Sequence, residues 1–163
     1  MKKFELTNEF VTNMFGTKLF RIRALVEFGD VEAGELGGYV EKESNLGHDG
    51  NAWVYGNAQV SGDARVSGNA RVSGNAWVSG NAQVSGNAWV SGDKDYAYAH
   101  GFGSCNHTTT FFRLKDGDVG VRCGCFYGTL AQFRDNVCET HGETKKAQEY
   151  LMLADLMDFR FKN

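Results

Sequence analysis

Residues 50–91 repeat one six-residue unit seven times, and this repeat constrains the fold more than any other feature of the chain. Ala52 and Val54 begin two series that recur every six residues up to Ala88 and Val90. Alanine and valine stand two residues apart in each unit, so they share one face of an extended segment. The other positions are rich in Gly, Asn and Ser, which form turns. Each unit therefore predicts a short strand and a corner, and stacked units bury the Ala/Val face as a solenoid.

The unit Val-Ser-Gly-Asn-Ala-x resembles the hexapeptide repeat of left-handed parallel β-helices, in which three units form one triangular coil. The resemblance covers residues 50–91 and implies 18 residues per coil, a little over two coils in all. Successive coils are then expected about 4.8 Å apart, the distance between paired strands. We expect a mainly β fold: a short left-handed β-helix over 50–92, an N-terminal β-rich cap over 1–49 and a small C-terminal α+β domain over 93–163.

Large side chains occupy the outward position between alanine and valine in several units. An 18-residue coil places Trp53, Arg71 and Trp89 in one row, where a guanidinium between two indoles makes cation–π contacts. Trp77 belongs to a second row. Such rows either stabilise the solenoid face or lie in a subunit interface, because exposed tryptophans are unusual on a monomer. Two coils bury few apolar side chains, and their burial does not offset the conformational entropy lost when the segment becomes ordered. We therefore expect further burial between subunits in a homo-oligomer, most simply a trimer.

The N-terminal segment has the features of a cap. Residues 18–28 alternate in polarity and predict a strand, while Tyr39, Val40 and Leu46 resemble imperfect first rungs of the solenoid. An atypical segment is needed here to cover the open edge of the first coil. The pattern LFRIRAL…FGDV..GELGGYVE is similar to the start of hexapeptide-repeat proteins encoded by phages and prophages. That resemblance implies a host bacterial cytoplasm.

The C-terminal segment predicts two strands followed by two helices. Residues 107–115 and 118–126 are strand-like and are joined by Asp116-Gly117, a hairpin turn signal. Thr129 and Gln132 have the capping-box spacing for a helix that His141-Gly142 closes, and a second helix follows to about residue 159. The expected unit is ββαα, and its pattern GS.N.TTTFFR..DG…V.CGCF.GTL resembles a domain downstream of such repeats in phage proteins.

Composition excludes several classes of partner. The net charge of −3 provides no general attraction for nucleic acid or an anionic membrane. The chain contains no apolar run long enough to span a bilayer and no signal-like start, so we expect a soluble protein without a membrane partner. Four cysteines in a chain of 163 residues fit reduced cytosolic thiols better than a disulfide framework.

The resemblance to hexapeptide-repeat proteins raises the possibility of acyl transfer. Many members of that class are trimeric acyltransferases that use acyl-CoA and a histidine base on the solenoid or on an extruded loop. The seven units here contain no histidine, and His48 precedes them in a turn-like Gly-His-Asp-Gly segment. Fold alone does not establish this activity, so we keep it as the alternative.

A metal site is a second possibility. Cys123, Cys125, Cys138 and His141 are four residues of the zinc-ligand type. The close spacing of the first two thiols on a strand opposes this hypothesis, and buried free cysteines that act as small hydrophobes explain the same residues.

An anion pocket is a third possibility. The segment 101–106 offers short polar groups and backbone N–H groups, and polar side chains from the following elements could converge on it. A tight lead-in to the hairpin is the alternative explanation. The candidate ligand-binding residues are Ser104, Asn106, Thr108, Thr110, Arg113, Arg122 and His141.

No catalytic set emerges from these residues, and no cofactor is expected. We therefore expect a non-enzymatic, oligomeric binding protein of phage type. Its expected partners are other copies of itself and either a host protein or a small anionic ligand such as a nucleotide. Binding of that partner is expected to inhibit a host defence.

Overall fold

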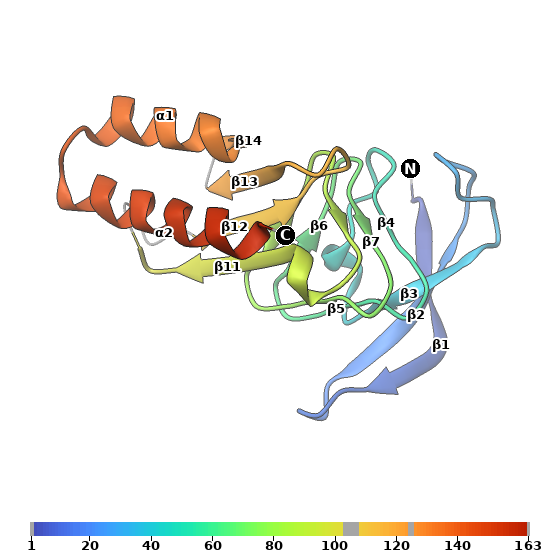
Figure 1. Ribbon diagram of the computed structural model, residues 1–163. Coiled ribbons are helices and arrows are strands. Elements are labelled where there is room, and N and C mark those ends of the chain that lie inside the picture. The colour runs from blue at the N-terminus through green and yellow to red at the C-terminus, as the bar shows by residue number, and fades with distance from the viewer. Residues whose placement is uncertain (1, 103–107, 124–125, 163) are drawn as a thin grey trace.

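The computed structural model describes residues 2–102, 108–123 and 126–162. In this part of the chain, three longer strands precede a series of two-residue strands, and four strands and two helices follow (Figure 1). The N-terminal strands are β1 (Phe4–Thr12), β2 (Lys18–Ala24) and β3 (Leu36–Val40). The short strands are β4 (Trp53–Val54), β5 (Gln59–Val60), β6 (Arg65–Val66), β7 (Arg71–Val72), β8 (Trp77–Val78), β9 (Gln83–Val84) and β10 (Trp89–Val90).

The short strands form a solenoid in which each strand pairs in parallel with the strand three units later. Arg71 of β7 lies between Trp53 of β4 and Trp89 of β10, and the pairs β5–β8 and β6–β9 have the same offset. This register confirms the 18-residue coil and excludes a two-sided roll that repeats every 12 residues. The alanine and valine of every unit are at most 1% exposed, so the repeat supplies the core of the solenoid.

The solenoid starts before the regular repeat. Tyr39 of β3 pairs in parallel with Gln59, and Leu46 bridges Val66, so the prediction of imperfect first rungs is confirmed. Both pairs are 20 residues apart rather than 18. The two extra residues fall between Leu46 and Trp53, in the corner that contains His48.

The N-terminal cap covers one row of the solenoid. Strands β1, β2 and β3 pair antiparallel. The ring centres of Phe4 and Phe28 lie 6.3 and 5.3 Å from the ring centre of Trp53. Trp53 is therefore fully buried within its own chain. The expectation that Trp53 lies in a subunit interface is wrong, because the cap already covers the outward indole.

Lys3 fastens the cap to the first regular unit. Its Nζ donates a hydrogen bond to the Ala52 carbonyl at 2.7 Å and lies 4.5 Å from the centre of the Phe28 ring. Burial lowers the pKa of Lys3 to about 8, although Asp49 opposes the shift. The charged form of Lys3 is thus disfavoured in the fold relative to the unfolded chain.

This lysine predicts a pH dependence of stability. Between about 8 and 10.5 the unfolded chain holds a proton on Lys3 that the folded chain has lost, so stability rises with pH. We expect the free energy of unfolding of the parent to increase by up to about 1.4 kcal/mol per pH unit relative to Lys3→Met. Denaturant titrations of both proteins between pH 7.5 and about 9.5 measure this difference. Parallel pH profiles for the two proteins would contradict it.

The C-terminal domain has more strands than expected. The sheet has four antiparallel strands in the order β11-β12-β13-β14. The predicted ββαα unit included β12 and β13 but neither β11 nor β14. The two helices pack their apolar residues on this sheet. The elements are β11 (Tyr96–His100), β12 (Thr108–Arg113), β13 (Val119–Cys123), β14 (Phe126–Thr129), α1 (Leu130–His141) and α2 (Lys145–Phe161).

The helix boundaries follow their caps. Thr129 and Gln132 form the predicted capping box of α1, and Gly142 ends the helix with a φ of 60°. In α2, Leu156 is 54% exposed. Met157 and Phe161 are buried, so the face of α2 that packs on the sheet runs through these residues.

Strand β12 joins the C-terminal domain to the last coil. Phe112 packs in the core of the solenoid, whereas its neighbour Phe111 packs under the helices. Thr110 Oγ1 accepts a hydrogen bond from the Gln83 backbone N–H at 2.9 Å, and Leu114 bridges Ala88. The hairpin formed by β1 and β2, which we call the cap hairpin, and the two helices therefore lie at opposite ends of the solenoid (Figure 1). None of the described helices is long and apolar enough to cross a membrane.

Candidate functional site

A cavity of about 420 Å³ lies where the last coil meets the turn between β12 and β13. We call it the junction cavity. Its size is within the range of small-molecule sites. Two rungs of the solenoid and the turn contribute its walls, which are Arg71, Ser73, Trp89, Ser91, Asp95, Arg113, Leu114, Lys115 and Gly117.

Arg71 is held in place on three sides. Its guanidinium carbon lies 4.4 Å from the centre of the Tyr55 ring and 5.1 Å from that of Trp89. Its Nη1 also contacts a carboxylate oxygen of Asp30 at 2.9 Å. Hydrogen bonds from Tyr55 and then Arg71 lower the pKa of Asp30, so this carboxylate stays charged at neutral pH. The predicted cation–π row exists from Arg71 to Trp89, but Tyr55 replaces the covered Trp53 as the second ring.

Arg113 is the second cation of the junction cavity. Its Nε lies 3.2 Å from Asp95, and its Nη2 donates to the Phe161 carbonyl at 3.1 Å. Burial raises the pKa of Asp95, but hydrogen bonds from Ser91 and Arg113 outweigh this effect and hold the pKa below its usual value. Arg113 therefore links the last coil to α2 while its guanidinium lines the cavity.

Lys115 differs from these two arginines. Among the described residues it forms no ion pair, and its Nζ lies 5.5 Å from the centre of the Trp89 ring. Its backbone N–H donates to the Asn87 carbonyl at 3.1 Å, which fixes the turn against the last coil. The junction cavity thus contains three cationic side chains and one carboxylate, that of Asp95. Such a site favours an anion.

The described members of the anion pocket predicted from the sequence do not converge as expected. Thr110 is buried against Gln83, and Thr108 Oγ1 shares a hydrogen bond with His100 Nδ1 at 2.9 Å. Arg122 is opposite Thr110 in the β12–β13 register, on the same side of the sheet.

The other predicted members of this pocket lie elsewhere. The ring of His141 packs against Tyr150 at 5.8 Å in the helical part of the domain. Ser104 and Asn106 are outside the described residues. Of the described members of the predicted set, only Arg113 lines the junction cavity.

Three of the proposed zinc ligands, Cys123, Cys138 and His141, lie in the described part of the chain. Cys123 hydrogen bonds with Thr109 at 3.2 Å and with Tyr150, whereas Cys138 is exposed on α1. The described residues contain no group of three or more His, Cys, Asp or Glu side chains that could hold a metal ion. Cys125 lies outside them, so the four-ligand hypothesis stays a prediction.

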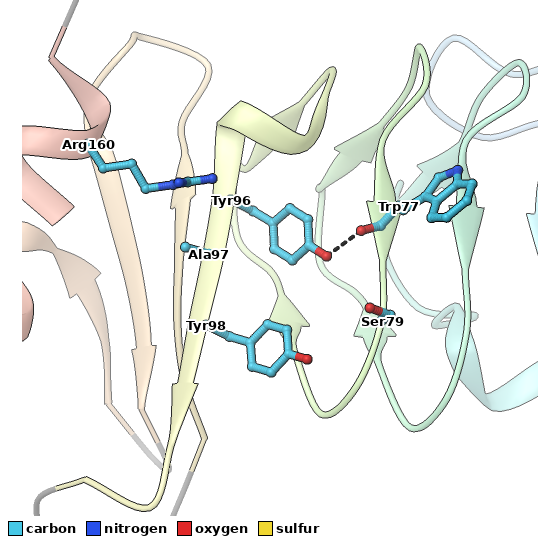
Figure 2. Close-up of a pocket in the computed structure, with 6 residues that line it drawn as sticks. All are labelled: Trp77, Ser79, Tyr96, Ala97, Tyr98 and Arg160. Atoms are coloured by element: carbon cyan, nitrogen blue, oxygen red, sulfur yellow. Dashed lines mark hydrogen bonds between the residues drawn. The ribbon is translucent and has the colours of Figure 1, made fainter. Parts of the chain in front are cut away.

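Trp77 lies on a different sheet of the solenoid from Trp89 and is 44% exposed. On one side it lines a cavity of about 430 Å³ with Tyr98, and the Tyr96 hydroxyl donates to the Trp77 carbonyl there (Figure 2). On the other side it lines a cavity of about 230 Å³ with Phe15, which is 84% exposed. Aromatic side chains therefore continue across this face from the cap hairpin to β11.

His48 has a structural environment in the cap. Its Nδ1 accepts a hydrogen bond from the Lys3 backbone N–H at 3.0 Å, and its ring stacks on Phe4 at 4.6 Å. A catalytic histidine base needs a free ring nitrogen directed at substrate. Here one nitrogen is occupied, and the other lies 3.8 Å from a Glu43 carboxylate oxygen.

Sequence reasoning did not identify Lys115 as a site residue. It belongs to the Lys-Asp-Gly hairpin turn, for which a purely structural explanation is sufficient. Its contact with Trp89 depends on how the C-terminal domain meets the last coil, and no local pattern carries that information.

Comparison with known proteins supports the repeat. The model of the YdcK beta solenoid repeat matches residues 58–72 and 64–80. The "Uncharacterized acetyltransferase YdcK" of Escherichia coli (strain K12) is 39% identical over 62 residues, which cover 34% of this chain and 19% of that protein. The chain thus spans about a fifth of the length of this curated relative. These matches and the parallel register together establish the central part of the chain as a β-solenoid of six-residue repeats.

Proposed function

We propose that this chain is a non-enzymatic, self-associating binding protein that holds a small anionic ligand in the junction cavity. The convergence of Arg71, Arg113 and Lys115 on that cavity carries the proposal, because Lys115 has no carboxylate partner in the described chain. Arginine forks bind phosphate or carboxylate through paired charge-assisted hydrogen bonds. The hydroxyls of Ser73 and Ser91 line the same cavity and provide further donors.

We propose that the solenoid coils left-handed, as the hexapeptide pattern implies. We also propose that the protein acts in a bacterial cytoplasm on behalf of a phage or prophage. Capture of a small ligand or of a host protein there would inhibit a host defence.

The experiment that tests ligand binding uses inorganic phosphate and pyrophosphate as probes. Isothermal titration calorimetry is expected to show binding to the parent that weakens about tenfold, or 1.4 kcal/mol, in Lys115→Gln and that falls with added salt. Arg65→Gln is the matched control, since Arg65 is an exposed cation on another sheet. No binding to the parent, or equal weakening in both variants, would contradict the proposal.

Acyl transfer is the second candidate, and the description of the YdcK relative as an acetyltransferase supports it. The similarity to that relative covers 34% of this chain, and His48 is engaged by the cap. Incubation of the purified protein with acetyl-CoA and amine acceptors distinguishes the candidates. Thiol release that disappears in His48→Ala would replace the binding proposal with an enzymatic one.

Self-association is expected to use the Trp77 face. Phe15, Trp77 and Tyr98 are large, exposed and continuous through the two cavities that flank Trp77. Multi-angle light scattering at micromolar concentration should show a mass near three chains, and Trp77→Glu should lower it by placing a charge in the apolar interface. Arg65→Glu on another sheet is the control. A monomeric parent would refute self-association and leave the aromatic face to a different partner.

A further inference from the structure

A second cavity adjoins the junction cavity on the side of β14. It has a volume of about 430 Å³ and is lined by Asn87, Leu114, Lys115, Asp116 and Tyr127. Leu114 and Lys115 also line the junction cavity, so the two cavities are neighbours at these residues. A ligand whose anionic group lies beside Lys115 can therefore extend into the second cavity.

Tyr127 provides a fixed aromatic surface in this second cavity. One face of its ring stacks on Phe112, with ring centres 6.3 Å apart and an interplanar angle of 20°. Phe112 is fully buried and belongs to the solenoid core, so it supports the ring from behind. The Tyr127 hydroxyl accepts a hydrogen bond from the Asn87 backbone N–H at 3.3 Å. Tyr127 is nevertheless 43% exposed and lines the cavity.

Gly86 allows this close approach of the tyrosine. Its φ is 63°, and a Cβ at this position would collide with the Tyr127 hydroxyl oxygen. The ring is thus held by a stack, a hydrogen bond and a glycine before any ligand arrives. A ring that is already ordered loses little conformational entropy on binding.

Polar groups suited to the edge of a planar heterocycle lie beside this ring. The side-chain amide of Asn87 has no hydrogen-bond partner among the described residues and offers both donors and an acceptor. Asp116 accepts a hydrogen bond from the Asp118 N–H through Oδ1 at 3.0 Å, which leaves Oδ2 for a hydroxyl or amino group.

We propose that the ligand is a nucleoside phosphate, with the phosphate in the junction cavity beside Lys115 and the base stacked on Tyr127. This inference rests on the proposed function, because it takes the anion site as given and adds the group attached to the anion. Base–aromatic stacking and an amide at the base edge provide recognition without a charged contact to the base. The carboxylate of Asp116 lies on the base side, where a ribose hydroxyl or an exocyclic amino group can donate to it.

The test compares three probes by isothermal titration calorimetry: AMP, ribose 5-phosphate and inorganic phosphate. The parent is expected to bind AMP at least about tenfold more tightly than ribose 5-phosphate, since only AMP brings a base to Tyr127. In Tyr127→Leu this ratio should fall to near one, whereas Tyr127→Phe keeps the ring and should retain most of the ratio. Circular dichroism confirms that each variant is folded.

The outcomes separate the two proposals. Equal affinity of the parent for AMP and ribose 5-phosphate would overturn the nucleoside while leaving the anion site intact. An unchanged ratio in folded Tyr127→Leu would also overturn it. Failure of all three probes to bind would overturn the anion site itself. The comparison of probes on the parent needs no variant, so a misfolded variant does not prevent a decision.

Discussion

Val72→Asp is expected to unfold the solenoid. Val72 is fully buried, and its strand pairs with Val54 on one side and Val90 on the other. A carboxylate there has no cationic partner inside a core of alanine and valine, which costs about 3–5 kcal/mol. That loss is comparable to the whole stability of many domains of this size, about 5–15 kcal/mol. Circular dichroism in a thermal or denaturant titration should show a variant that is largely unfolded or melts far below the parent.

Arg65→Asp is the control for this substitution. It introduces the same carboxylate on an outward position of β6, where the side chain is exposed. Exposed substitutions usually change stability by less than about 0.5 kcal/mol. A melting temperature of Val72→Asp within a few degrees of this control would mean that Val72 does not face the core.

Gly74→Ala is expected to produce the second large loss of stability. Gly74 has a φ of 62°, and a Cβ there would collide with the backbone carbonyl oxygen of Ser91 in the next coil. The left-handed conformation costs alanine about 1–2 kcal/mol, and displacement of a packed backbone adds about 1–3 kcal/mol. Because Ser91 lines the junction cavity, we also expect weaker phosphate binding in this variant.

Gly56→Ala separates these two costs. Gly56 has nearly the same φ, 59°, yet nothing lies within 4 Å of the Cβ that alanine would add. Gly56→Ala should therefore lower the free energy of unfolding only by the conformational cost, about 1–2 kcal/mol. Denaturant titrations of both variants measure the difference. Equal losses would show that the coils separate easily at their corners.

The solenoid could be predicted because every unit carries the same information. The two-residue spacing of Ala52 and Val54, repeated without interruption, determines both the buried face and the corners. The first rungs at Tyr39 and Leu46 were also predictable, since their apolar residues continue the series after a small change in spacing. The start of α1 followed from the hydrogen bonds that Thr129 and Gln132 can make locally.

The surroundings of the outward residues could not be predicted in this way. Trp53 and Trp89 have the same position in the unit, but one is fully buried and the other is 40% exposed. The difference arises because Phe4 and Phe28, distant in the sequence, cover Trp53. Strand β11 was missed for a related reason, since Tyr96–His100 has only a short alternation that is stabilised by pairing with β12.

The candidate site depends most strongly on such distant contacts. Arg113 was selected from the sequence, but Thr108 and His141, which were grouped with it, contact other parts of the domain. Lys115 and Tyr127 acquire their importance from the docking of the β12–β13 turn and of β14 onto Asn87 in the last coil. A pattern in one segment does not encode the position of another segment on its surface.

The row of contacts along β4, β7 and β10 connects the two ends of the molecule. Asp30 of the cap contacts Arg71, and Lys115 of the C-terminal domain lies over Trp89. Insertion or loss of a single six-residue unit would rotate one end by a third of a coil and separate these partners. A whole 18-residue coil would preserve their angular phase and only increase their separation by about 4.8 Å. The repeat is therefore a phased spacer, whose length can change in evolution or design by complete coils but not by single units.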